Sequence, residues 1–181
     1  MIAYDVSVLR VYPYNGKDVK WQKMLKNFDF NTFKTTRTGV IGRVLTSDNE
    51  LNMKHLKEFI ATQAKVEVIS EGKFVIPEQW YSRFDVGKCG KRSSAEADLS
   101  ILARATFERE DSRIFSEITL ESTGGEITKF SMRSRLGENY MIFGIPNQIF
   151  DDGKEHSETV IFMVPRLIRT LKTLKPIKNN L

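Results

Sequence analysis

Residues 95–107 alternate between apolar and polar side chains, and this pattern limits the possible folds more than any other feature. The apolar positions are Ala95, Ala97, Leu99, Ile101, Ala103, Ala105 and Phe107, and every intervening residue except Leu102 is polar. A period of two sends alternate side chains to opposite faces of a strand. The pattern therefore predicts a long strand in an antiparallel sheet that has one buried and one solvated face.

Several shorter segments also favour strands. They are residues 2–12, 40–45, 65–71, 73–76, 113–121, 126–134, 140–145 and 159–164. Gly124-Gly125 indicates a hairpin between two of them, and Pro165 is expected to end the last. Residues 29–36 and 77–92 are interpreted as loops.

Helical patterns are fewer. Trp21, Met24, Leu25 and Phe28 recur at helical spacing after Asp18, and Ser47 with Glu50 forms a capping box ahead of a second helix. A third, basic helix is expected between Pro165 and Pro176. The order of elements predicts a single α+β domain, with an antiparallel sheet packed against two or three helices.

Charge is distributed unevenly along the 181 residues, whose net charge is +5. Residues 1–47 and 166–181 are both basic, whereas the segment between them is acidic. We therefore divide the chain into a compact domain, 1–165, and a basic C-terminal helix and tail, 166–181. Basic ends favour an anionic partner, either nucleic acid or a lipid surface, although they are also typical of a solvated tail. Attraction between acidic and basic regions of different copies would favour self-association.

Two groups of residues are candidate contacts. The first, for a membrane or another anion, comprises Arg166, Arg169, Lys172, Lys175, Lys17, Lys20 and Lys23. The second is a docking loop that combines aromatic and basic side chains, namely Trp80, Tyr81, Phe84, Lys88, Lys91 and Arg92. Rings beside cations suit base stacking on RNA or insertion among lipid headgroups.

Catalytic and metal-binding patterns are weak. The chain has one cysteine and two histidines, none in a nucleophile or zinc motif. The segment from Gly87 to Lys91 resembles a phosphate loop, but a strand rather than a helix is expected to follow. We therefore expect a protein that is not an enzyme and that uses no cofactor, metal or small-molecule substrate.

Two patches resemble the matrix proteins of rhabdoviruses. The first is residues 76–87 (IPEQWYSRFDVG), which match an aliphatic-Pro-Glu-x-aromatic run of that family followed by Phe, an aliphatic residue and Gly. The second combines 129–131 (KFS) with 140–145 (YMIFGI). Animal members carry a Lys-rich N-terminal tail with a Pro-Pro-x-Tyr motif, which this sequence lacks, so the resemblance is to the short, plant-infecting type.

The resemblance implies a structural protein of the virion. Such a protein self-associates into a polymer, condenses the viral nucleocapsid or its RNA, and links it to the anionic inner face of the envelope membrane. Its expected locations are the virion, the host cytoplasm and the inner membrane face, with the nucleus left open. Two alternatives remain: an RNA-binding viral accessory protein without a membrane role, and a small hydrolase or transferase built from dispersed residues.

Overall fold

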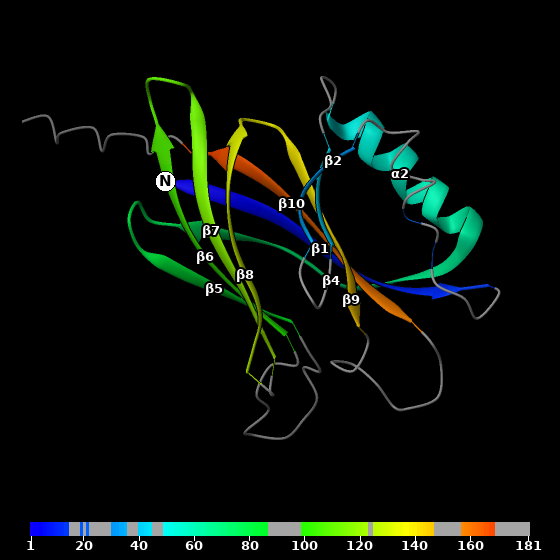
Figure 1. Ribbon diagram of the computed structural model, residues 1–181. Coiled ribbons are helices and arrows are strands. Elements are labelled where there is room, and N and C mark those ends of the chain that lie inside the picture. The colour runs from blue at the N-terminus through cyan, green and yellow to red at the C-terminus, as the bar shows by residue number, and fades with distance from the viewer. Residues whose placement is uncertain are drawn as a thin grey trace, which may run out of the picture.

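The computed structural model describes residues 1–14, 19, 21, 30–35, 40–44, 49–86, 99–122, 125–146 and 157–168. These ranges contain ten strands and one helix (Figure 1). The elements are β1 (Ile2–Pro13), β2 (Phe30–Thr35), β3 (Val40–Val44), α2 (Asn49–Gln63), β4 (Ala64–Ile76), β5 (Tyr81–Val86), β6 (Leu99–Glu108), β7 (Arg113–Ser122), β8 (Gly125–Arg135), β9 (Asn139–Pro146) and β10 (Glu158–Leu167).

The strands form two antiparallel sheets that pack face to face. The six-stranded sheet has the order β2-β3-β9-β10-β1-β4, and the four-stranded sheet has the order β5-β6-β7-β8. Helix α2 covers part of the other face of the six-stranded sheet, so the molecule has three layers (Figure 1). The predicted α+β class with two or three helices is therefore wrong, because the described residues are dominated by strands and contain a single helix.

Strand β1 shows how the sequence builds these layers. Its side chains at Ile2, Tyr4, Val6 and Val8 enter the core between the two sheets, whereas Leu9 and Val11 pack under α2. From α2, Leu56 and Ile60 close this second core, as their helical spacing predicts. The long strand predicted from period two is confirmed for its described part, β6, whose Leu99, Ile101, Ala103 and Ala105 all face the other sheet. Residues 95–98 lie outside the described residues.

Two predicted loops are strands. Segment 29–36 contains β2, and segment 77–92 contains β5. In β5 the apolar–polar alternation is hard to recognise, because one inward position, Ser82, is polar. The Ser82 hydroxyl donates a hydrogen bond to the Val75 carbonyl at 2.9 Å. Phe84 and Val86, the other inward residues, pack on the core between the sheets.

Two predicted strand ends are also wrong. Segments 65–71 and 73–76 form one continuous strand, β4, which bulges opposite Val8 and Leu9 instead of turning at Gly72. β10 runs through Pro165 to Leu167. It pairs with β9 only as far as Met163. On the β9 side, position 165 therefore makes no backbone hydrogen bond, and the lack of an N–H in Pro165 costs nothing there.

A buried hydroxyl pair joins the two sheets. Tyr4 on β1 and Ser116 on β7 share a hydrogen bond, and both side chains are inaccessible to solvent. Burial raises the pKa of Tyr4 from 10.0 to about 12, although the hydrogen bond from Ser116 by itself lowers it. The neutral phenol is therefore the form that the folded protein stabilises.

Replacing Tyr4 with Phe tests this pair. At pH 8 the Tyr4→Phe variant should lose about 1–2 kcal/mol of unfolding free energy, because Ser116 is left buried without its partner. Above pH 10 the unfolded chain releases the Tyr4 proton before the folded chain does, so the wild type should lose about 1.4 kcal/mol relative to the variant by pH 11. Urea unfolding at the two pH values measures both. A variant that tracks the wild type at alkaline pH would contradict the assignment.

Candidate functional site

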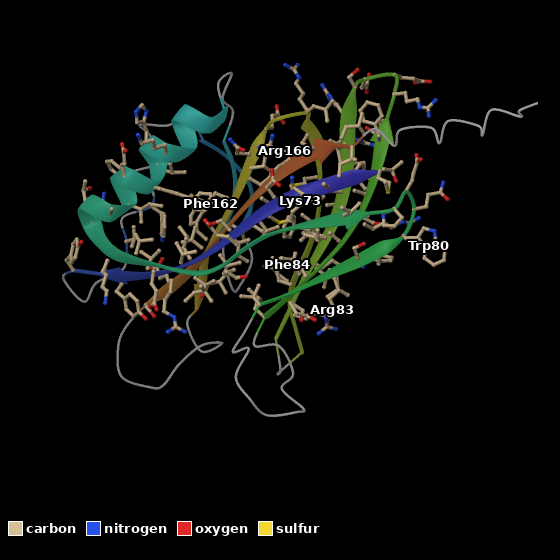
Figure 2. The ribbon with its side chains drawn as sticks, turned by 180° about the vertical axis from the view of Figure 1, so that it is seen from behind. Lys73, Trp80, Arg83, Phe84, Phe162 and Arg166 are labelled. Atoms are coloured by element: carbon tan, nitrogen blue, oxygen red, sulfur yellow. The ribbon has the colours of Figure 1, made fainter. Side chains whose placement is uncertain are left out.

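The turn between β4 and β5 presents a tryptophan to solvent. The Trp80 N–H donates to the Pro77 carbonyl at 3.1 Å and closes a four-residue turn. Gln79 has a φ of 69°, in the left-handed region where turns of this shape usually carry glycine. The indole of Trp80 is 71% exposed and projects away from the molecule (Figure 2). An ordered turn thus holds a large apolar ring in water.

Of the other predicted docking residues, Tyr81 joins Trp80 and Phe84 does not. Tyr81 begins β5, is 55% exposed, and has the Arg104 guanidinium 5.7 Å from its ring centre. Phe84 instead turns inward, where its ring stacks on Phe74 with 5.6 Å between centroids. Lys88, Lys91 and Arg92 lie outside the described residues. The docking surface that the structure describes is therefore the tip of the β4–β5 turn, which connects the two sheets and carries Trp80 and Tyr81.

A polar network supports the outer side of β5. The guanidinium of Arg83 donates to Asp85 at 2.6 Å and to Ser100 at 2.7 Å, and the Ser100 hydroxyl donates to Asp85 at 2.6 Å. Partial burial alone would raise the pKa of Asp85, but the hydrogen bonds from Arg83 and Ser100 and the Arg83 charge together hold it below its ordinary 3.8. The network ties β5 to β6 along the strand that follows the turn.

Next to α2, the six-stranded sheet is hollowed into a cleft of about 610 Å³. Phe162 and Val164 of β10 contribute apolar lining, and the charged side chains come from α2, β1, β4 and β10. Figure 2 shows Phe162, Lys73 and Arg166 on this side of the molecule. The cleft has a volume typical of small-molecule sites.

The carboxylates at the cleft are already paired. Asp5 bonds Arg166 and lies 3.3 Å from the Lys73 ammonium. Glu71 accepts a hydrogen bond from the Ser7 hydroxyl at 3.0 Å and lies 3.7 Å from Lys57. These contacts fasten β10, β1 and β4 to one another and to α2. As described, the cleft is an ion-paired surface.

The predicted anion contacts are only partly described. Arg166 belongs to β10 rather than to a C-terminal helix, and its guanidinium bonds Asp5. The others, Arg169, Lys172, Lys175, Lys17, Lys20 and Lys23, lie outside the described residues, as does nearly all of the predicted helix 18–28. Their contact with an anion stays a prediction.

Sequence reasoning missed the pairing at the cleft. Asp5, Glu71 and Lys73 lie on adjacent strands, and register places Asp5 opposite Lys73 and Ser7 opposite Glu71. An alternating strand does show which of its residues share a face, but not which strand lies beside it. The pairing of β1 with β4, which are more than fifty residues apart in the sequence, could therefore not be predicted from the sequence.

The described ranges contain neither a metal-binding cluster nor a membrane-spanning helix. No group of three His, Cys, Asp or Glu side chains there could hold a metal ion. No helix within those ranges is long and apolar enough to cross a membrane.

Comparison with known proteins gives no relative. No protein-family model matches the chain, and no curated protein or solved structure is significantly similar to it.

Proposed function

We propose that this chain is a viral structural protein of the matrix type, without catalytic activity. It associates with further copies of itself, condenses viral nucleoprotein and binds the anionic inner face of a membrane. The short sequence patches shared with rhabdovirus matrix proteins support the proposal, and so do the basic ends of the sequence. The observation that carries it is the tip of the β4–β5 turn, Trp80 and Tyr81.

The tip of the β4–β5 turn has the properties of an interface anchor. Trp is highly buried on average, and Trp and Tyr contribute much of the binding energy of many interfaces, so the 71% exposure of Trp80 favours a contact with a partner. The turn hydrogen bond and the network below it order the backbone before binding, which lowers the entropic cost of association. The Arg104 guanidinium lies beside the Tyr81 ring, where it can exchange its pairing with Glu117 for an acidic group of a second copy or a lipid headgroup.

Removal of both rings tests this proposal. A Trp80→Ser/Tyr81→Ser variant should lose at least about thirtyfold in self-association affinity, as expected when interface anchors are removed. Light scattering and sedimentation velocity over a concentration series measure the effect. The wild type should grow into large assemblies as concentration rises, while the variant stays small.

Val68→Ser is the matched control. Val68 is 55% exposed, as Tyr81 is, and it lies in the first half of β4, away from the turn. This control should assemble like the wild type. If the double variant assembled as readily as the wild type, the proposed self-association through the tip would be contradicted. A wild type that stays monomeric at high concentration would contradict it as well.

A further inference from the structure

The outer face of the four-stranded sheet carries a row of cations. In β8, Phe130, Met132 and Ser134 are buried, so the alternate residues Lys129, Ser131, Arg133 and Arg135 point outward and are exposed. In β7, the partly exposed residues Arg113, Phe115, Glu117 and Thr119 lie on this same face. β8 is an edge strand, so the row runs along one border of the sheet (Figure 1).

Three arginines on this face are balanced by acids. Arg83 lies 4.0 Å from Glu121, Arg104 lies 3.7 Å from Glu117, and Arg133 lies 3.1 Å from Glu108. These pairs are the arrangement expected of a solvated sheet face, where opposite charges on neighbouring strands stabilise the pairing.

Arg113 and Arg135 break that arrangement. The register of β7 and β8 places them directly opposite each other. Glu108, the residue opposite Arg113 on β6, has its carboxylate bonded to Arg133. Within the part of the chain that the structure describes, neither guanidinium has an acidic partner. Like charges placed opposite each other destabilise a sheet, so the protein bears a cost that an anion between the two guanidinium groups would remove.

An aromatic ring lies in the adjacent row. Phe115 is directly opposite Arg133, whose guanidinium lies 5.4 Å from the ring centre. Cations that follow a strand, together with an aromatic side chain, are the combination by which proteins hold single-stranded nucleic acid: phosphates contact the cations and bases stack on the ring.

The charges beside this row favour a ligand with a single sugar-phosphate backbone. Lys129, Arg133 and Arg135 span about 20 Å of strand, a length that suits several nucleotides in an extended conformation. Glu117 and Glu121 on β7 lie alongside and would repel a second phosphate chain or a flat anionic bilayer. The surface is therefore narrower and more mixed in charge than a duplex or a membrane would favour.

We propose that the outer face along β7 and β8 binds single-stranded RNA, with Arg113 and Arg135 as a paired phosphate contact and Phe115 as a stacking surface. The inference deepens the nucleoprotein part of the proposed function and rests on it. It involves a different surface from the tip of the β4–β5 turn, so the two proposals can fail separately.

The test is the affinity of the full chain for a fluorescent single-stranded oligo(U) RNA, measured by anisotropy from 50 to 300 mM salt. Each phosphate contact to a single strand contributes about −0.7 to the slope of log affinity against log salt. Arg113→Gln/Arg135→Gln should therefore make the slope shallower by about 1.4 and weaken binding roughly 10- to 100-fold at 50 mM salt. Phe115→Leu should weaken binding about tenfold with little change in slope.

Lys54→Gln/Lys65→Gln is the matched control, because it removes two exposed cations from α2 and β4 and should leave RNA binding nearly unchanged. Thermal unfolding supplies a second readout. Because the substitution removes two like charges that face each other, the melting temperature of the arginine variant should stay unchanged or rise. A clear fall in melting temperature would show that Arg113 or Arg135 has a structural partner in the folded protein.

Wild-type affinity and slope in the arginine variant would overturn the inference, as would an equal loss in the lysine control. So would a wild type that fails to bind RNA at 50 mM salt.

Further outcomes separate this inference from the matrix proposal. Loss of anionic-vesicle binding in the arginine variant, with RNA binding intact, would assign the face to a membrane instead. Normal self-association and vesicle binding without RNA binding would reject this inference alone. RNA binding without either would reject the matrix proposal.

Discussion

Phe162→Ala should remove about 3–5 kcal/mol of unfolding free energy, as expected for truncation of a buried phenylalanine. Phe162 lies on β10 at 2% exposure, in the core that α2 closes with Leu56 and Ile60. Its ring also lies 5.8 Å from the Lys57 ammonium. The truncation leaves a hole beside the cleft and removes the contact surface of the helix, so α2 should lose its packing before the two sheets separate.

Urea unfolding gives the loss of free energy, and hydrogen exchange locates it. Amides of α2 should exchange faster in the variant, whereas those of β6 and β7 should keep their protection until the whole molecule unfolds. Val68→Ala, at an exposed position on β4, should cost less than about 1 kcal/mol. A loss below about 1 kcal/mol for Phe162→Ala would mean that α2 is not held by this core.

Gly72→Val should destabilise the protein by about 1–3 kcal/mol, the usual cost of overpacking. A Cβ at position 72 would lie 2.8 Å from Cε2 of Phe84, whose ring belongs to the stacked series Tyr4, Phe74 and Phe84. Strand propensity alone predicts the opposite sign, since valine favours strands and glycine weakens them. The sign of the change in urea midpoint therefore tests the contact directly.

A second substitution separates the ring from the backbone. If Phe84 is the obstacle, Phe84→Leu should absorb most of the cost of Gly72→Val, and the two changes should couple by about 1–2 kcal/mol. Additive effects would show that the Phe84 ring is not the obstacle at position 72.

The individual strands were largely predictable, because alternation within one strand is a local property. β6, β7 and β8 match their predicted segments to within a few residues. The errors arose where a local signal had a tertiary cause. Gly72 suggested a turn, yet it provides space for Phe84, and Pro165 suggested a strand end, yet it lies beyond the pairing with β9. Such causes depend on neighbours that are distant in sequence.

The candidate sites divide in the same way. Trp80 and Tyr81 could be chosen from the sequence, because an aromatic pair after Pro77 has no apolar periodicity around it. The inward turn of Phe84 and the opposition of Arg113 to Arg135 could not, since both depend on strand register. Arg166 was predicted to lie in a helix because the sequence does not show strand register. In the structure it lies on β10 and pairs with Asp5 on the neighbouring strand β1.

Co-sedimentation with vesicles is the most direct test of the matrix proposal. Anionic and neutral vesicles would be compared at low and physiological salt, using the wild type and a variant carrying Arg169→Glu, Lys172→Glu and Lys175→Glu. Arg166 is left in place because it bonds Asp5. The proposal predicts salt-sensitive pelleting of the wild type with anionic vesicles only, growth into large assemblies, and weaker pelleting of the variant. A wild type that pellets with neither kind of vesicle and stays monomeric at high concentration would contradict it.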